Sequence, residues 1–481
     1  MSPVTRRLLA IALVVAAAAL VAAALLRLLG GDDAPPPGAL PDIGQAPGSG
    51  DPEGDPLAWD EDREDAFVAA AARGFAHPLY VHSPGGAVAT ARRVARYREV
   101  VEGVARSAGL DPDTVEAMVF LESAGRPDVA ADPRLEGAVG LTQILAETGR
   151  NLLGMRVDPA GARRLGRSIR RNEARGRGEV VQRLRERRRR IDERFDPVKS
   201  LQATARYLTI ARRHLGRDDL AVASYHMGIG NLQSVLRAYG ADDVPYARLF
   251  FDVTPLRHER AWSRLSSFGD DSSTYLWRVL AAKEIMRLWR EDPEELERRE
   301  RLQTRKGSAE ELLHPPEETR VLDTPDDVED AIGEGALVRL EADRLARAGI
   351  AIDPGMGERA GRLDRPRSLY RALRPEALAV LAYIGTGVRA ISQTSPLVLT
   401  STVRDRRYQR LLVDDNREAT RNYSLHTTGW AFDIERSYAS RAQARAFQFM
   451  LDRLQALDLI AWVREPAAIH VTVSPRVRDW L

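Results

Sequence analysis

The sequence predicts a multidomain protein with an N-terminal transmembrane helix, an all-α domain and a C-terminal α+β domain. Three observations predict this fold class. The first is the length: 481 residues are too many for one ordinary hydrophobic core and indicate several domains. The second is an uninterrupted apolar stretch near the N-terminus. Further along, the apolar periodicity is first helical throughout and then mixed with short β-rich runs. The 44% hydrophobic and 29% charged residues are typical of a globular protein, which excludes wholesale disorder.

Residues 1–30 are predicted to form a signal anchor. No charged side chain interrupts residues 8–26, which at ~1.5 Å per helical residue approach the ~30 Å thickness of the hydrocarbon core. Arg6 and Arg7 precede this stretch and predict a cytoplasmic N-terminus. We therefore expect a single-pass protein of the inner (cytoplasmic) membrane, with its later domains exported to the periplasmic, cell-wall side. A cleaved signal peptide is the alternative, and it exports the same residues.

Two further segments complete the N-terminal half. Residues 31–65 are rich in Pro, Gly and Asp and predict an extended linker. Residues 66–290 are predicted to form the all-α domain. Its helical stretches include residues 100–107, 113–121, 201–215 and 220–239.

An Arg-crowded insertion interrupts this domain at residues 156–194. It predicts a solvated helical hairpin, and a cationic arm for anionic cell-wall polymers or lipid headgroups is the alternative. The formal net charge of the chain is only +2, and the insertion lacks the interleaved aromatic residues typical of single-stranded nucleic-acid binding. We expect no nucleic-acid partner.

The C-terminal part changes character. Residues 291–335 are dense in charge and predict a linker, and residues 336–481 predict a smaller α+β domain. The absence of Cys excludes disulfides, thiolate zinc sites and cysteine nucleophiles, so any metal site must use His and carboxylates. The predicted helices are 340–348, 375–393 and 441–457, and the β-rich runs are 397–402 and 468–473.

A Glu behind an apolar run is the first candidate catalytic group. Residues 115–123 (VEAMVFLES) predict a helix that ends at Glu122 and Ser123. Apolar neighbours desolvate a carboxyl group and raise its pKa, which an acid needs in order to hold a proton near neutral pH. Cleavage of a glycosidic bond requires such an acid to protonate the leaving oxygen. Taken alone, however, a Glu at a helix end is usually a solvated surface residue.

The motifs that follow resemble, in their order, those of the lysozyme-like domain of soluble-type lytic transglycosylases. They are Glu122 with Ser123, residues 140–143 (GLTQ), residues 195–201 (FDPVKSL), residues 225–231 (YHMGIGN) and Tyr275. The resemblance implies non-hydrolytic cleavage between N-acetylmuramic acid and N-acetylglucosamine, with a 1,6-anhydro product and no cofactor. Glu122 would act first as the acid and then as the base. The residues that would hold the sugar, orient the acid or shape the loop are Ser123, Gln143, Tyr225, Asn231 and Tyr275.

Two positions depart from the pattern of that family. Thr142 stands where Met is usual, and His226-Met227 stand where Asn-Ala is commoner. These departures put individual glycan contacts in doubt and leave the acid in place.

The second constellation is a candidate zinc site near the C-terminus. It comprises residues 424–433 (SLHTTGWAFD) and residues 468–473 (AIHVTV). Two imidazoles and one carboxylate, from His426, His470 and Asp433, make a three-ligand zinc site with an open fourth position. Gly429 would let the chain turn so that His426 and Asp433 converge. A single His is more often a structural or surface residue, but two of only 8 His fall in this pattern.

The segment 424–433 resembles the signature of zinc D-alanyl-D-alanine carboxypeptidases, whose fold is shared with Hedgehog-type domains. The similarity covers residues 370–475 and implies zinc bound by His426, Asp433 and His470. It also implies that Arg404 steadies a carbonyl oxygen or a substrate carboxylate. Family members commonly place a general-base Glu three residues before the last His, but Ala467 stands there. The nearest candidate base is therefore Glu465.

Together the two resemblances imply a bifunctional enzyme that acts on peptidoglycan, cutting glycan strands and trimming stem peptides with zinc. The alternative is a lytic transglycosylase whose C-terminal domain is a non-catalytic wall-binding or scaffold module. The sequence leaves this alternative open because the metal ligands would be the same in both cases.

Overall fold

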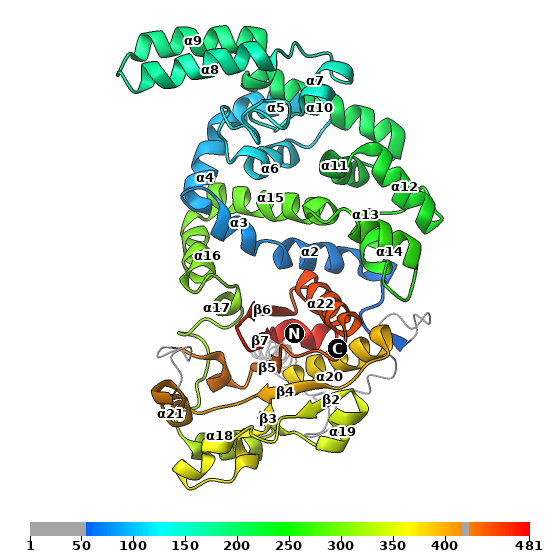
Figure 1. Cartoon of the computed structure of the whole chain (residues 1–481), viewed down its shortest axis with the longest axis vertical. Helices are drawn as coiled ribbons and strands as arrows, with labels where there is room; N and C mark the ends of the chain where they lie inside the picture. The colour runs from blue at the N-terminus through cyan, green and yellow to red at the C-terminus, as the bar shows by residue number, and fades with distance from the viewer. Residues whose placement is uncertain (1–53, 416–422) are drawn as a thin grey trace, which may run out of the picture. The chain divides into compact units, whose positions relative to one another are not determined.

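The computed structural model describes residues 54–415 and 423–481 (Figure 1). By their internal contacts, all of these described residues belong to one compact unit.

The predicted transmembrane helix requires a correction. Among the described residues, no helix combines the length and the apolar composition that crossing a membrane requires. Helix α10, with 19 residues, is long enough but carries Arg206, Arg212 and Arg213, and each Arg costs about 2.5–3.5 kcal/mol at the bilayer centre. This finding contradicts the predicted single-pass location in the inner membrane. The predicted span, residues 8–26, lies outside the described residues.

The first part of the described chain is helical, as predicted. Aspartates begin several of its helices: the side chains of Asp111 and Asp196 accept backbone N–H groups at the starts of α6 and α10. The helices are α2 (Glu64–Gly74), α3 (His77–His82), α4 (Ala87–Val94), α5 (Arg98–Ala108), α6 (Pro112–Ser123), α7 (Ala146–Asn151), α8 (Pro159–Glu173), α9 (Gly178–Ile191), α10 (Pro197–Leu215), α11 (Asp218–Met227), α12 (Ile229–Tyr239), α13 (Tyr246–Asp252), α14 (Glu259–Ser266) and α15 (Tyr275–Glu291).

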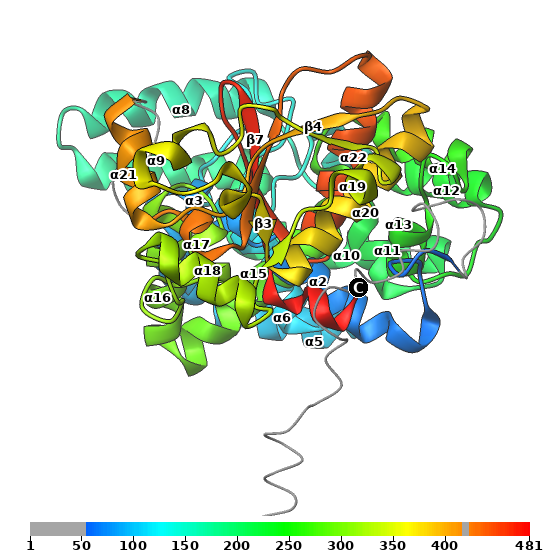
Figure 2. The same ribbon diagram turned by 90° about the horizontal axis from the view of Figure 1, so that it is seen from below.

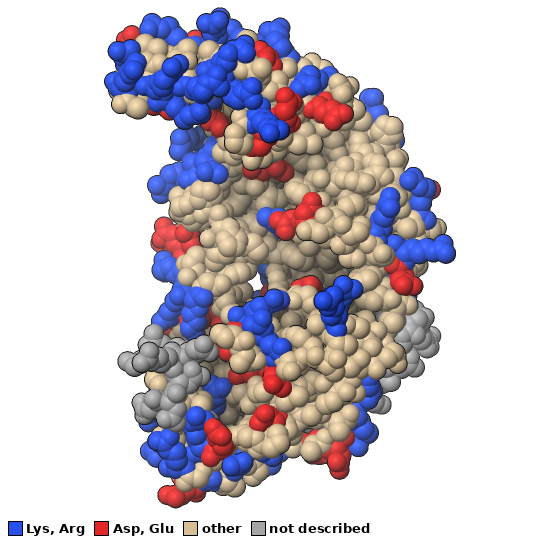
Figure 3. Space-filling model, in the orientation of Figure 1, with Lys and Arg blue, Asp and Glu red and all other residues tan. Residues whose placement is uncertain are grey.

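One predicted helix is two helices. The stretch 220–239 breaks at Gly228, whose φ of +88° lies in the region that glycine tolerates and other residues rarely adopt. Helix α11 therefore ends at Met227, and α12 leaves in a new direction. The predicted insertion 156–194 forms a helical hairpin from α8 and α9, and Lys and Arg side chains gather on the surface over these two helices (Figure 3).

The predicted linker 291–335 contains helices of its own. They are α16 (Pro293–Arg305), α17 (Glu310–Leu313) and α18 (Pro325–Gly333). The elements that follow are β1 (Val338–Arg339), α19 (Ala342–Arg347), β2 (Ile350–Ile352), β3 (Ala372–Leu373), α20 (Pro375–Ser392), β4 (Leu397–Ser401), α21 (Arg406–Asp415), β5 (Ala431–Glu435), α22 (Arg441–Ala456), β6 (Ile460–Arg464) and β7 (Ala468–Val473).

A mixed sheet organises the C-terminal part, in agreement with the predicted α+β class. Its strand order is β2-β4-β5-β7-β6, in which β2 and β4 are parallel and the other neighbours antiparallel. Helices α20 and α22 pack against each other (Figure 2), and they contact β7 and β6 respectively. Within the sheet, Asp433 of β5 and Val463 of β6 stand directly opposite His470 of β7. The sheet therefore brings chemistry-bearing residues of separate motifs to one place.

Candidate active sites

Glu122 lies near the end of α6, whose residues 115–120 are buried in the core. Met118 and Val119 of α6 are fully buried and pack in the helical core to which Trp277 of α15 belongs. Helix α6 ends at Ser123 because Ala124 adopts a left-handed conformation. Glu122 itself is partly buried and lines a cavity of 210 Å³. The cavity is also lined by Pro78, Leu79, His82, Ser83, Pro84, Phe120, Leu121, Ser123, Ala124, Arg126 and Arg278.

The hydroxyl of Tyr275 donates a 2.6 Å hydrogen bond to Oε1 of Glu122. Tyr275 is the first residue of α15 and is 1% exposed, so the donor is fixed by packing. Burial raises the pKa of Glu122 from its ordinary 4.5 to about 7, although the Tyr275 hydroxyl and the Arg278 cation both favour the charged form. A carboxyl with this pKa is protonated in a substantial fraction of molecules near neutral pH, which is what a general acid requires.

Tyr225 links this acid to the loop before α7. Its ring stacks on the ring of Tyr275 at a centroid distance of 6.1 Å, and its hydroxyl donates to the carbonyl of Thr142 over 2.8 Å. Gln143 has a positive φ of +51° and its amide donates to the carbonyl of Gly140 at 2.8 Å, so its side chain braces its own loop. The Thr142 hydroxyl is buried against that of Ser200, 2.7 Å away. In place of the usual Met, Thr142 thus joins the loop to α10.

Two predicted binding residues have structural partners. The buried Ser123 hydroxyl bonds the Val119 carbonyl of its own helix at 3.4 Å, which agrees with a role in shaping the loop. The Asn231 amide donates to the carbonyl of Met227 at 2.9 Å, across the break between α11 and α12. Exposed Asn231 therefore holds the turn between α11 and α12.

Arg194 fixes the loop that carries Gln143 and was not singled out by the sequence. It is fully buried with Asp192, and its guanidinium bonds both oxygens of that carboxylate at 2.8 and 2.9 Å. It also donates to carbonyl groups of the loop, those of Leu135, Gly137 and Ile144. His226, which the sequence marked only as a departure from the family pattern, stacks its ring on that of Tyr275 at a centroid distance of 5.5 Å.

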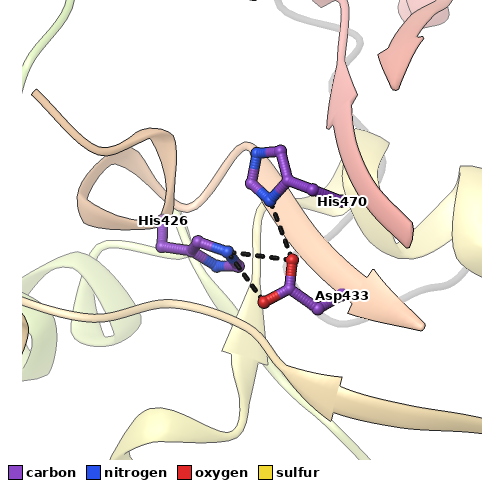
Figure 4. Close-up of side chains that lie close together, drawn as sticks. All are labelled: His426, Asp433 and His470. Carbon is purple, nitrogen blue, oxygen red and sulfur yellow. Dashed lines mark hydrogen bonds and ion pairs between the residues drawn. The ribbon is translucent and has the colours of Figure 1, made fainter. Parts of the chain in front are cut away.

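The second site brings His426, Asp433 and His470 together from three elements (Figure 4). His426 lies on a short 3-10 turn, η8 (Leu425–Thr428), and Gly429 ends this turn with a φ of +77°, as its predicted role requires. Asp433 and His470 are register partners on β5 and β7. One atom of each side chain can be chosen so that all three lie within 4.8 Å of one another.

These residues fit a tetrahedral zinc ion. Ligands at about 2.0–2.1 Å from a tetrahedral centre lie roughly 3.3 Å apart. Oδ1 of Asp433 lies 3.2 Å from Nε2 of His426 and 2.8 Å from Nδ1 of His470, near that separation, and the three ligand atoms all lie within 4.8 Å of one another. Each imidazole also has an acceptor for its remote nitrogen: the carbonyl of Thr402 lies 2.8 Å from Nδ1 of His426, and Glu310 lies 2.8 Å from Nε2 of His470. Such outer partners are typical of metal-binding His.

The electrostatics of the two imidazoles differ. Burial and the Arg404 cation lower the pKa of His426 to about 4, despite the neighbouring Asp433 carboxylate, so this ring is neutral. Burial also disfavours the charged form of His470. The hydrogen bonds to Asp433 and Glu310 favour that form more strongly, and they raise the pKa of His470 to about 10. Without an ion, the proton on His470 balances the two carboxylates. An ion would take the place of that proton.

Arg404 and Glu465 flank the cluster. Arg404 donates to Oδ2 of Asp433 at 3.3 Å and lines a cavity of 270 Å³ between β4 and residues 353–359. Glu465 follows β6 and, by strand alternation, continues on the face of Val463, which is the face of His470. Partial desolvation and the Asp433 charge raise the pKa of Glu465, although its side chain is exposed. Glu465 thus lies on the His470 side of the sheet with an exposed side chain, and its role as the base stays a prediction; the expected position, Ala467, carries no carboxylate.

Residues 99–244 match the model of the Transglycosylase SLT domain family. The match spans Glu122, Ser123, Gln143, Tyr225 and Asn231, and Tyr275 follows outside it. It supports lytic transglycosylase activity on peptidoglycan. No curated protein matches the chain. The resemblance of the C-terminal domain to zinc carboxypeptidases stays a prediction.

Proposed function

We propose that this chain cleaves peptidoglycan at two kinds of bond. Glu122 would cleave the glycosidic bond between N-acetylmuramic acid and N-acetylglucosamine, and the site of His426, Asp433 and His470 would cleave a bond of the stem peptide. The observation that carries the proposal is the Glu122 carboxyl, with a pKa of about 7, bonded by Tyr275 beside a cavity.

In the glycan reaction, Glu122 gives its proton to the bridging oxygen while the bond from that oxygen to C1 of the muramic acid breaks. The 6-hydroxyl oxygen of the same sugar then attacks C1, and its proton returns to Glu122. The products are a 1,6-anhydro end and a free 4-hydroxyl. Tyr275 orients the carboxyl and favours its charged form between the two transfers.

The composition of the cavity supports this route over two-carboxylate hydrolysis. Hydrolytic glycosidases place a second Asp or Glu opposite the acid, roughly 5–9.5 Å away. Among the described residues that line the 210 Å³ cavity, Glu122 is the acidic one, and the other charged side chains are cationic. Intramolecular attack by the sugar hydroxyl needs no second carboxylate.

In the peptide reaction, zinc bound by the two His and Asp433 would supply a Lewis acid that polarises the scissile carbonyl and acidifies a water. Glu465 would accept the proton of the attacking water and pass it to the leaving amine. Arg404, which lines the 270 Å³ cavity, would hold the carbonyl oxygen or a carboxylate of the substrate.

A second candidate function for the C-terminal domain is peptide binding without hydrolysis. The observation that favours it is Ala467, which leaves the usual base position without a carboxylate. In this case zinc and Arg404 would hold the stem peptide against the domain. Glu465→Gln separates the two functions, because it removes the base and keeps the ligands.

The test is mass spectrometry of purified cell-wall sacculi digested by the full-length protein and two variants. Glu122→Gln should abolish 1,6-anhydro products and leave peptide changes intact, and His426→Ala should do the reverse. If both variants lose both activities together, the two-site proposal fails. Zinc bound by the wild type with no peptide product would favour the binding function.

A further inference from the structure

We propose that Glu310, on α17, is a positioning residue of the metal site. Its carboxylate accepts the Nε2–H of His470 and thereby turns the Nδ1 of that ring toward the ion. The inference rests on the proposed metal site and assigns a role to a residue far from the motif that predicts it.

The geometry places Glu310 and Asp433 on the two opposite nitrogens of one ring. Oε1 of Glu310 lies 2.8 Å from Nε2 of His470, and Oδ1 of Asp433 lies 2.8 Å from Nδ1. Since His426 is also on the Asp433 side, an ion can be held by all three ligands only through Nδ1 of His470. The remaining Nε2 must then carry a hydrogen, and a buried N–H without an acceptor costs about 1–3 kcal/mol.

The Glu310 carboxylate is itself held in place. It is 5% exposed, and the hydroxyls of Ser308 and Thr472 donate to its two oxygens at 2.9 and 3.0 Å. With the His470 bond, both oxygens have partners and the carboxylate has a defined orientation. Carboxylate–histidine–metal arrangements of this kind fix the tautomer and raise the basicity of the ligand.

The two imidazoles are positioned by different means. His426 donates to the backbone carbonyl of Thr402, the residue that follows β4. His470 relies on a charged side chain from α17, in the segment that precedes the α+β domain in sequence. Two carboxylates, Asp433 and Glu310, together match the charge of a divalent ion. The segment 291–335, predicted only as a linker, therefore completes the metal site.

Glu310 is neither a ligand nor the base in this arrangement. Its oxygen faces the nitrogen that points away from Asp433, so the imidazole ring separates it from the ion. If the ion pair of Glu310 and His470 only held α17 against β7, replacing Glu310 would weaken zinc binding no more than replacing another buried carboxylate of α17. Glu311 offers a matched control: it is 1% exposed on the same helix and pairs with Lys306 at 3.1 Å and Arg305 at 3.2 Å.

The experiment measures zinc affinity of the full-length protein by competition with a chelator, for Glu310→Ala, Glu310→Gln and Glu311→Gln. Glu310→Ala should weaken zinc binding about 10- to 100-fold. Glu310→Gln keeps an oxygen acceptor and should lose less, and Glu311→Gln should bind as the wild type does. Nitrogen-15 NMR of the histidine side chains provides a second readout. In the zinc-loaded wild type His470 should carry its hydrogen on Nε2 with a strong hydrogen-bond shift, and Glu310→Ala should lose that shift.

The possible results test the positioning role of Glu310 and the metal site separately. Wild-type affinity and an unchanged His470 signal in both Glu310 variants would overturn the positioning role and leave the metal site standing. Equal weakening by Glu311→Gln would reduce the role of Glu310 to holding α17 in place. If Glu310→Ala does not fold, Glu310→Gln decides with the same two measurements. A wild type that binds no zinc, or a His426→Ala variant with unchanged affinity, would overturn the metal site itself.

Discussion

Replacing Glu122 by Gln should make the protein more stable at alkaline pH while it removes glycan cleavage. Raising a carboxyl pKa from 4.5 to about 7 disfavours the charged form in the folded protein by about 3 kcal/mol, at about 1.4 kcal/mol per tenfold change in the ionisation constant. Because the pKa of Glu122 is higher in the folded protein than in the unfolded chain, the folded protein binds more protons than the unfolded chain between pH 4.5 and 7. Stability therefore falls as the pH rises through this interval.

Gln cannot ionise, and its amide oxygen can still accept the Tyr275 hydroxyl. Glu122 touches solvent at the cavity, so part of the penalty is screened, and we expect the variant to gain about 1–3 kcal/mol over the wild type at pH 8.5. At pH 4 the two proteins should differ by much less, because Glu122 is then neutral in both states. Chemical denaturation of both proteins at the two pH values measures the difference.

Glu99→Gln on α5 is the control, since Glu99 is exposed and its replacement should give no comparable gain. A stability difference between wild type and Glu122→Gln that is the same at pH 4 and pH 8.5 would refute the reasoning. In that case the carboxyl would ionise as freely in the folded protein as in the unfolded chain, and its use as a general acid near neutral pH would lose its physical basis. The glycan activity of the wild type should correspondingly decline as the pH rises through about 7.

Further predictions concern both sites. Tyr275→Phe removes the hydrogen bond that favours ionised Glu122. The alkaline limb of the pH–activity profile should therefore move to higher pH, and the turnover rate should fall about tenfold. An alkaline limb at the wild-type pH would contradict this role of Tyr275. Glu465→Gln should keep wild-type zinc affinity by chelator competition and lose peptide hydrolysis, and full retention of hydrolysis would exclude it as the base. Arg194→Met leaves Asp192 charged and unpaired in the interior, so unfolding experiments should show a loss of about 3–5 kcal/mol; a loss below 1 kcal/mol would mean that water reaches the pair.

The sequence predicted much of the local structure, because local signals determine it. Apolar periodicity, with a capping side chain or Pro at the starts of α6, α10, α20 and α22, located these four helices and α5 within a few residues. The strand β7 was predicted with its observed limits. The failures have physical causes as well. Gly228 broke a helix that its flanking residues favour, and the short strands β2, β5 and β6 take their stability from neighbours in the sheet.

The sequence also determined which residue types are present for chemistry: an acid behind an apolar run, two imidazoles and a carboxylate. Only the tertiary structure decided what surrounds them. The Tyr275 hydroxyl that meets Glu122 is 153 positions away in the chain, and Glu310 is 160 positions from His470. Burial, ion pairs and hydrogen bonds depend on distances in space, and these interactions set the pKa of an acid and the orientation of a metal ligand. No periodicity or motif spacing encodes such distances, because they arise from the packing of the whole fold.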